Sequence, residues 1–150
     1  MQQAIEAALE GVRSGKGGPF GAAVVKGGEV VAVACNRVLS SNDPTAHAEV
    51  EAIRAACAKL GTFRLAGCEL YATCEPCPMC LGAAYWARVD RVVYACGRAD
   101  ASRAGFDDGM LYEEFEKPAA QRRLALVPFM RDEALSVFQA WLEKPDRTPY

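Results

Sequence analysis

The sequence predicts an α/β fold built on a mixed β-sheet, and three observations lead to this prediction. After an initial hairpin, helix-like and strand-like stretches alternate along the chain, which is typical of a layered sheet with an antiparallel edge. The chain has 150 residues, and a domain of that size buries roughly two-thirds of its unfolded surface. It contains no repeat, low-complexity stretch or interdomain linker, so we expect a single domain over residues 1–150.

The first half of the chain is expected to form a helix, a hairpin and a second helix. The glycines at 15–18 end a stretch with helical apolar spacing, which predicts an amphipathic helix that carries Ile5, Ala8, Leu9 and Val12. The stretches 20–25 and 30–34 are predicted strands, because the Lys-Gly-Gly-Glu at 26–29 is typical of a tight hairpin turn. Asn42-Asp43-Pro44-Thr45 then indicates a turn followed by a helix start.

The second half continues with a strand at 69–73, a helix at 77–87 and a strand at 91–95. Pro76 suits the start of that helix, so both cysteines of its first turn should lie on one face. The C-terminal third is less regular and contains Pro118 and Pro128. A last helix is expected around Leu135, Phe138 and Leu142.

Two short motifs place metal-binding side chains at two of these helix starts. Residues 47–49 read His-Ala-Glu and residues 76–80 read Pro-Cys-Pro-Met-Cys, which together form the H-x-E and P-C-x-x-C signature of zinc deaminases. His47, Cys77 and Cys80 would supply one imidazole nitrogen and two thiolates and leave a fourth position open for water, as a catalytic zinc site requires. His47 is the only histidine, so nothing competes for the nitrogen position. The expected cofactor is Zn²⁺.

Glu49 is the expected catalytic acid and base. Residues two apart point in different directions from a helix axis, so His47 and Glu49 are not expected to bind the same ion side by side. Each part also has a simpler interpretation when taken alone: a structural histidine, a redox cysteine pair, or a glutamate that favours the helix dipole. A redox pair would need neither His47 nor Glu49, so the combination favours a catalytic zinc site.

Charge and cysteine content narrow the cellular setting and the partners. The net charge of −2, with no long basic run, argues against a large phosphate-binding surface, so a nucleic-acid partner is not expected. Seven cysteines without a secretory leader or a long apolar span fit a reducing cytoplasm, and no membrane partner is expected. The cysteines outside the metal site are expected to be small buried residues: Cys35, Cys57, Cys68, Cys74 and Cys96.

Longer blocks of residues surround the two motifs and continue to the C-terminus. The blocks at 17–21, 41–49 and 74–83 resemble both guanine and tRNA adenosine deaminases, so they indicate only the cytidine deaminase-like superfamily. Three further blocks, with a terminal Tyr150, resemble the bacterial guanine deaminases: Tyr85-Trp86-Ala87-Arg88, Ala104-Gly105-Phe106-Asp107-Asp108 and Phe138-Gln139-Ala140-Trp141. This resemblance covers nearly the whole chain and implies a three-layer sandwich with helices on both faces of the sheet.

The resemblance also implies the hydrolysis of guanine to xanthine and ammonia. Zinc would lower the pKa of its bound water, so that hydroxide is the nucleophile at neutral pH. Glu49 would take the water proton and deliver protons to a ring nitrogen and to the leaving amine. Ammeline and cytosine are alternative substrates for the same pocket.

Five residues are assigned to the substrate pocket by this resemblance. Asn36 would hydrogen-bond the base through its amide, Asp108 would accept from a purine N–H, and Phe20 would pack on the ring. Trp86 and Tyr150 are further candidates. Other roles stay open, because Asn36 could close a strand end, Phe20 could lie in the core, and either aspartate of the 107–108 pair could cap a turn. Two residues compete for the role of a second acid and base: Glu113 and Glu114.

Two other functions compete with a small-molecule purine deaminase. A tRNA adenosine deaminase would place a flipped base in the same pocket and would need a positively charged surface around it. That family usually ends in a helix rich in Lys and Arg, whereas this chain ends in a mixed segment from Phe138 to Tyr150. A non-enzymatic zinc module would need a fourth protein ligand, for which Cys74 is the nearby candidate.

The resemblance further implies a homodimer in which the C-terminal segment, about residues 130–150, is exchanged between protomers. The polar tail from Lys144 to Pro149 would be disordered on composition alone unless something ties it down. Tyr150, with its aromatic ring and carboxylate, could do so by helping to close the active site. The other interpretation is a frayed end with no role.

Overall fold

The structure is a computed structural model, and it describes residues 1–149. The chain divides into two compact units, residues 1–109 and 110–150. From the sequence we expect one domain, with a C-terminal segment of about residues 130–150 that is exchanged between protomers. The boundary between the two compact units lies earlier in the chain than the start of that segment. It lies at the start of α6 (Gly109–Glu116), a helix without a single buried residue. Each unit is described by itself.

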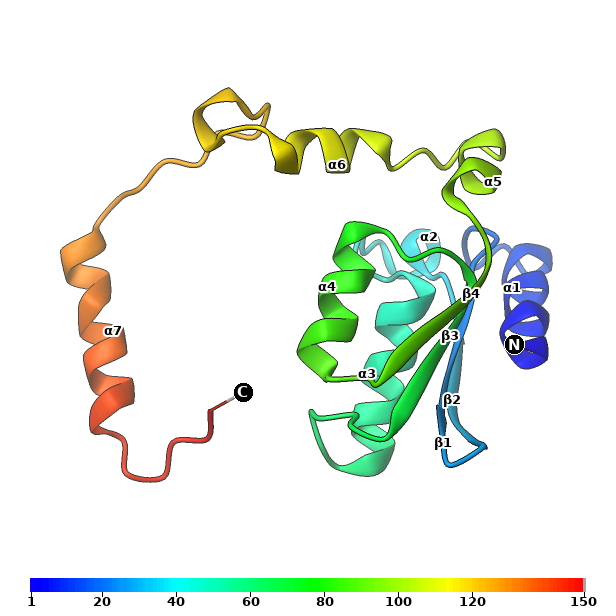
Figure 1. Ribbon diagram of the computed structural model, residues 1–150, viewed down its shortest axis with the longest axis horizontal. Coiled ribbons are helices and arrows are strands. Elements are labelled where there is room, and N and C mark those ends of the chain that lie inside the picture. Colours follow the sequence, from blue (N-terminus) through cyan, green and yellow to red (C-terminus); the bar gives the residue numbers. More distant parts are fainter. Residues whose placement is uncertain (150) are drawn as a thin grey trace. The chain divides into compact units, whose positions relative to one another are not determined.

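The first unit is built on a four-stranded mixed sheet with strand order β2-β1-β3-β4 (Figure 1). The strand β1 pairs antiparallel with β2 and β3, whereas β3 and β4 are parallel. Gly27 and Gly28 both have positive φ, as the predicted two-residue hairpin turn requires. The α/β sheet with an antiparallel edge is therefore confirmed, with these strands: β1 (Gly21–Lys26), β2 (Glu29–Cys35), β3 (Cys68–Cys74) and β4 (Arg91–Cys96).

Helices cover both faces of this sheet and produce the expected three layers. The helix α1 (Gln2–Arg13) lies on one face, and α3 (Ala48–Leu60) and α4 (Pro78–Ala87) lie on the other, as Figure 1 shows. Two short helices, α2 (Val38–Ser41) and α5 (Arg98–Arg103), follow β2 and β4 respectively. The first turns of α3 and α4 carry the two motifs.

The core lies between the sheet and the α3–α4 layer. Its largest fully buried side chains include Leu65, Leu70, Val24 and Cys68. Three alanines of α3 are also fully buried, which lets the helix approach the sheet closely: Ala48, Ala52 and Ala56.

The helix α1 packs on the opposite face through small residues rather than through its large apolar ones. Ala4, Ala8 and Gly11 are buried, whereas Ile5, Leu9 and Val12 stay between 37% and 49% exposed. The reason is close backbone approach, because a Cβ on Gly21 would lie 2.0 Å from the carbonyl oxygen of Ala4. The expected helix is therefore confirmed, but the prediction of which face it buries is only partly right.

The prediction that the remaining cysteines are buried is wrong for Cys96. Its side chain is exposed because β4 is the edge strand of the sheet. Cys68 and Cys74 are buried, and Cys35 and Cys57 are partly buried. All seven cysteines are free thiols, as expected for a chain without a disulfide framework.

The second unit contains most of α6, a short 3-10 turn (Ala119–Gln121) and α7 (Arg131–Glu143). The predicted last helix is confirmed, but none of its residues is buried. Within residues 1–149, no helix is long and apolar enough to cross a membrane.

Candidate active site

The two sequence motifs occupy equivalent positions at the starts of α3 and α4. His47 is the N-cap of α3 and Cys77 is the N-cap of α4, both with extended backbone. Pro78 occupies the first helical position of α4. The prediction that Pro76 starts this helix is therefore wrong by two residues. Cys80 follows in the first turn, where free backbone amides favour a negatively charged side chain.

The three predicted metal ligands converge with the spacing of a tetrahedral site. The Nδ1 atom of His47 lies 3.6 Å from the Sγ of Cys77 and 3.5 Å from the Sγ of Cys80. All three ligand atoms lie within 4.8 Å of one another. Ordinary Zn–S and Zn–N bond lengths at tetrahedral angles require an N···S separation of about 3.6 Å. The donor set therefore fits zinc, with Nδ1 as the imidazole ligand atom.

The hydrogen bonds of this cluster leave one thiolate beside one protonated thiol, so a cation would be needed to keep both sulfur atoms deprotonated. The pKa of Cys77 is lowered to about 4 by the hydrogen bond from the Cys80 thiol and by His47. That same hydrogen bond, together with burial, raises the pKa of Cys80. The hydrogen bond to Cys77 raises the pKa of His47. Two thiolates so close together repel each other, and a divalent cation between them offsets that repulsion.

Glu49 lies beside the metal-binding cluster, in the second position of α3. Its side chain is buried, with 7% exposure, yet it faces the cavity that His47 and Cys77 also line. Burial raises the pKa of Glu49, and the Cys77 thiolate adds to the effect. A carboxyl group with a raised pKa exchanges protons more readily near neutral pH, which suits a proton shuttle.

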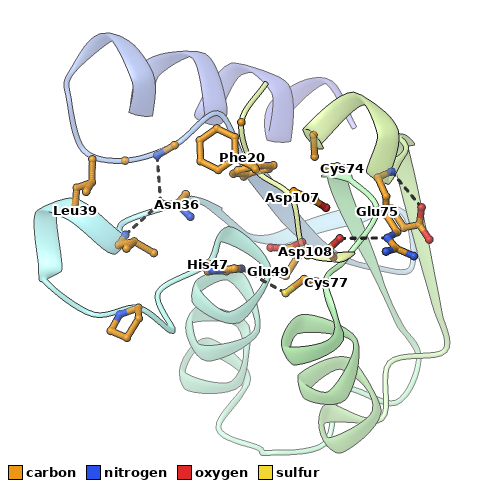
Figure 2. Close-up of a pocket in the computed structure, with 18 residues that line it drawn as sticks. Phe20, Asn36, Leu39, His47, Glu49, Cys74, Glu75, Cys77, Asp107 and Asp108 are labelled. Carbon is orange, nitrogen blue, oxygen red and sulfur yellow. Dashed lines mark hydrogen bonds and ion pairs between the residues drawn. The ribbon is translucent and has the colours of Figure 1, made fainter. Parts of the chain in front are cut away.

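A cavity of about 650 Å³ opens above this cluster. Figure 2 shows Phe20, Asn36, Glu49 and Asp108 around it together with His47 and Cys77. Its walls are mostly apolar with a few polar groups, the usual character of a small-molecule site.

Asn36 is buried, and its amide orientation is determined by its hydrogen bonds. The backbone N–H groups of Gly18 and Val38 both donate to Oδ1 of Asn36 at 3.2 Å, as the dashed lines in Figure 2 show. Because Oδ1 is occupied by two donors, the group that Asn36 can offer a ligand is its Nδ2 amide. Asn36 therefore has the structural role left open from the sequence, and its Nδ2 group is the donor that remains.

Phe20 and Phe106 form an aromatic wall of the cavity. Their ring centroids lie 4.9 Å apart at an interplanar angle of 85°, an edge-to-face arrangement. Phe106 belongs to the loop between α5 and α6, so this contact anchors the loop to the segment that precedes β1. The sequence blocks contain Phe106, but nothing in them indicates this pairing.

The two neighbouring aspartates have different roles. Asp107 accepts a hydrogen bond from the backbone N–H of Gly109 at 2.9 Å and so caps the turn into α6. Asp108 instead accepts from Nε of Arg98 at 3.2 Å. Arg98 in turn donates its backbone N–H to Glu75. Both Arg98 and Glu75 line the cavity, and neither was predicted as a site residue from the sequence. The position of Glu75 directly before the second motif was the one signal that could have indicated it.

Of the two further pocket candidates, Trp86 does not line this cavity in the described part of the chain, and Tyr150 cannot be placed. Trp86 lies near the end of α4, 66% exposed, and is not among the residues that line the cavity in the described part of the chain. Its inclusion rested on membership in a sequence block, which says nothing about side-chain direction. Tyr150 lies outside the described residues.

The two candidates for a second acid and base lie in the C-terminal unit. Glu114 accepts hydrogen bonds from Nζ of Lys117 and from the backbone N–H of Arg123, both at 2.6 Å. These contacts lower the pKa of Glu114. Its carboxylate is thus engaged within its own unit, whereas Glu113 is exposed, and the choice between the two residues stays open.

Comparison with known proteins gives this site its family. Residues 1–96 match the family model of the cytidine and deoxycytidylate deaminase zinc-binding region. Over 150 residues the chain is 51% identical to the guanine deaminase of Bacillus subtilis (strain 168), which covers 100% of this chain and 96% of that protein. The chain belongs to the guanine deaminase family.

A solved structure supports this assignment, and a member of another deaminase family is less similar to this chain. The X-ray structure of guanine deaminase from Bacillus subtilis superposes with a TM-score of 0.95 at 52% identity and covers 99% of this chain and 95% of that one. A tRNA-specific adenosine deaminase of Aquifex aeolicus (strain VF5) is 36% identical over 126 residues, which are 84% of this chain and 81% of that protein. The guanine deaminase family thus accounts for more of the chain, including its C-terminal third.

Zinc is the cofactor of this deaminase family, and the metal-binding group of the chain fits it. Among the residues that the structure describes, the candidate ligand cluster contains three side chains and no fourth one. Cys74 is not part of it, and its thiol contacts the carbonyl oxygen of Gly97 instead. A closed structural zinc site would need a fourth protein ligand, so the cluster has the ligand number of a catalytic site.

Proposed function

We propose that this protein hydrolyses guanine to xanthine and ammonia, with Glu49 as the proton shuttle. The observation that carries the proposal is a single cavity lined by the metal-binding cluster, by the buried carboxyl group of Glu49, and by one hydrogen-bond donor and one acceptor. His47, Cys77 and Cys80 would hold zinc, which supplies Lewis-acid activation of water at neutral pH. The family relationship over the whole chain supports guanine as the substrate.

The proton route runs through Glu49. One water and one guanine react to give xanthine and ammonia, so the amine nitrogen must leave in protonated form. Glu49 lies next to the metal ligands and faces the cavity. It takes one proton from the water and delivers it to a ring nitrogen as the hydroxyl group adds to C2. It then carries the remaining proton of that hydroxyl to the 2-amino nitrogen, so that C2 becomes a carbonyl carbon and ammonia leaves. Without this transfer the leaving group would be an amide anion, which is far too basic to depart.

The base is read by one donor and one acceptor. Asn36 offers its Nδ2 donor because its Oδ1 is occupied by Gly18 and Val38. Asp108 offers a carboxylate oxygen to a purine N–H, while Phe20 and Phe106 supply the apolar wall for the ring. Guanine carries both carbonyl and N–H groups along its edge, so it can satisfy both polar partners at once.

The test is an ammonia-release panel on protein of known zinc content. Guanine, adenine, cytosine, ammeline and a tRNA anticodon stem are compared at equal concentration. We expect guanine to be the preferred substrate, with xanthine formed in equal amount to ammonia. Preference for the anticodon stem would instead identify a tRNA adenosine deaminase, and preference for ammeline or cytosine would correct the substrate within the same mechanism.

We further propose that the protein is a cytoplasmic homodimer in which the C-terminal segment is exchanged. Several large apolar side chains of the C-terminal unit are more than 60% exposed: Leu124, Leu126, Val127, Phe129, Val137 and Phe138. A monomer rarely exposes so many large apolar side chains within one short stretch of chain, and such exposure usually marks an interaction site. Sedimentation equilibrium of the full chain and of a chain ending at residue 129 tests this proposal. A full chain that is monomeric at micromolar concentration would contradict it.

A further inference from the structure

We propose that Arg98 is a positioning residue that holds Asp108 in the orientation needed to read the base, and that it connects this carboxylate to the loop of the metal ligands. The inference rests on the proposed function, because it takes Asp108 as the acceptor for a purine N–H. It adds to that function a residue that neither the zinc signature nor the sequence blocks point to.

Asp108 stands at a place where the backbone alone does not determine its side chain. It lies in the loop between α5 and α6, after Gly105, whose φ of 89° marks a sharp turn. Phe106 donates its backbone N–H to the Ala101 carbonyl oxygen, and Asp107 caps Gly109. These contacts hold the loop, but none of them involves the Asp108 carboxylate.

The Arg98 guanidinium supplies the missing restraint. Its Nε donates to Oδ1 of Asp108 at 3.2 Å, and the two side chains are 38% and 23% exposed. Figure 2 shows this contact at the cavity wall. Among the described residues no hydrogen bond to the second oxygen, Oδ2, is found, so the pair leaves one acceptor for a ligand. A charge-assisted hydrogen bond has a preferred geometry and therefore orients the carboxylate.

Arg98 is itself tied to the loop that carries Cys77. Its backbone N–H donates to Oε2 of Glu75 at 3.4 Å, and the backbone N–H of Glu75 donates to the Cys96 carbonyl oxygen at 2.9 Å. Glu75 lies two residues before Cys77. The series Glu75, Arg98, Asp108 thus connects the metal-ligand loop, the start of α5 and the base-reading carboxylate.

Positioning of this kind matters because hydrogen bonds to the substrate need an acceptor that is already oriented. A carboxylate that samples several rotamers loses that freedom on binding, and this entropy cost weakens the complex. Misplacement of the base by about 1 Å is enough to lower turnover by about a hundredfold. Loss of Arg98 should therefore weaken guanine binding and productive orientation while the metal site stays intact.

The experiment is a double-mutant cycle on the full-length, zinc-loaded protein. Arg98→Met, Asp108→Asn and the double variant are compared with wild type for kcat and KM on guanine. The dissociation constant for guanine is also measured for the same four proteins, each carrying Glu49→Gln. All four can then be compared by binding even where a variant has no measurable turnover. Arg98→Lys tests rescue by a retained charge. Arg103→Met is the control, because Arg103 belongs to the same helix and pairs with Asp100 outside the cavity.

We expect Arg98→Met to lower kcat/KM by about tenfold to a hundredfold, mainly through KM, with unchanged zinc content. In the Asp108→Asn background the same substitution should change kcat/KM and the dissociation constant by less than about threefold, because contacting residues are not additive. Arg98→Lys should recover part of the loss.

Three results would overturn the inference. One is wild-type behaviour of Arg98→Met, and another is an equal loss with and without Asp108, which would mean that Arg98 acts on its own. The third is a decrease of kcat/KM in Arg103→Met as large as that in Arg98→Met, which would mean that the loss of one positive charge, and not the contact with Asp108, causes the effect. Wild-type turnover of guanine is measured first, because its absence contradicts the proposed function itself, whereas turnover with an insensitive Arg98 contradicts only this inference.

Discussion

Glu49 is the residue on which the proposed chemistry depends most directly. Glu49→Gln keeps the shape and polarity of the side chain but removes its exchangeable proton. We expect the variant to fold and to hold zinc while turnover of guanine falls by about a hundredfold to ten-thousandfold. Steady-state kinetics with metal analysis by atomic emission measure both quantities.

The metal ligands provide the matched comparison for that prediction. His47→Ala, Cys77→Ala and Cys80→Ala each remove one of the three converging ligand atoms, so these variants should lose zinc as well as activity. A Glu49→Gln protein with normal zinc content and turnover within a few-fold of wild type would rule out the role proposed for Glu49.

Asn36 and Asp108 are expected to determine which base is accepted. Asn36→Asp keeps the Oδ1 acceptor that Gly18 and Val38 use but replaces the Nδ2 donor by an acceptor. Asp108→Ala removes the acceptor altogether. Because a polar group left unpaired in a site strongly weakens binding, each variant should lose at least about a hundredfold in kcat/KM on guanine. Unchanged kinetics in both, with zinc still bound, would show that the base is read elsewhere.

At the residue scale the sequence predicts side chains whose roles follow from local spacing. His47, Cys77 and Cys80 could be predicted because helix starts orient them and the chemistry of zinc restricts the ligand set. The contacts of Arg98 with Asp108 and of Phe106 with Phe20 could not, since each joins side chains from different segments of the fold. The position of Trp86 outside the cavity lining could not be predicted either, because a sequence block does not tell which way a helical side chain points.

Individual elements are held in place by a few close backbone contacts, and Gly17 is the clearest case near the cavity. A Cβ at Gly17 would lie 2.2 Å from the backbone oxygen of Asn36 and 2.6 Å from its Oδ1. Gly17→Ala must therefore displace Asn36, so we expect it to lower both the melting temperature and kcat/KM on guanine. Thermal unfolding and kinetics of the purified variant check these two effects.

Gly82 in α4 is the matched control for this substitution. A Cβ there meets nothing within 4 Å, and the position is in a helix interior. Gly82→Ala should therefore stabilise the protein by about 0.5–1 kcal/mol at unchanged activity. A Gly17→Ala variant as active as Gly82→Ala would contradict the expectation that displacing Asn36 lowers kcat/KM on guanine.

The pairing of β3 with β4 at the sheet edge contributes to the free energy of unfolding in a pH-dependent way. Glu69 faces Arg91 across the two strands, and its pKa is lowered by the hydrogen bond from the Tyr71 hydroxyl and by Arg91. Because the folded-state pKa lies below the ordinary 4.5, this stabilisation is present above that pH and is lost as the pH falls through the lower folded value.

Glu69→Gln should accordingly unfold at lower urea concentration than wild type at pH 6 to 7, and the difference should narrow below about pH 4.5. Urea titrations across this range measure it. Since Arg91 is exposed and Glu69 is partly exposed, the difference should also shrink in high salt. A constant difference at all pH values would mean that the substitution acts through packing rather than through the charge of Glu69.

At the scale of the whole molecule, the active-site cavity and the C-terminal third belong to different compact units. Among the residues that the structure describes, those that line the cavity run from Gly17 to Asp108 and belong to the first unit. The sequence patterns correctly predict the layered sheet of this unit, because apolar periodicity reports directly on a buried face. They do not indicate the boundary after Gly109, because none of the residues of α6 is buried and no apolar face reports on its packing.

The C-terminal tail offers a test of whether the second unit contributes to catalysis. Tyr150 remains a predicted pocket residue, with an aromatic ring on an otherwise polar tail. Closing a segment over the bound base would exclude water from the reacting centre and complete the site. Deleting residues 146–150 should then lower kcat/KM on guanine without changing the zinc content or the melting temperature. Tyr150→Ala separates the ring from the rest of the tail, and a truncated protein with wild-type kinetics would support a frayed end instead.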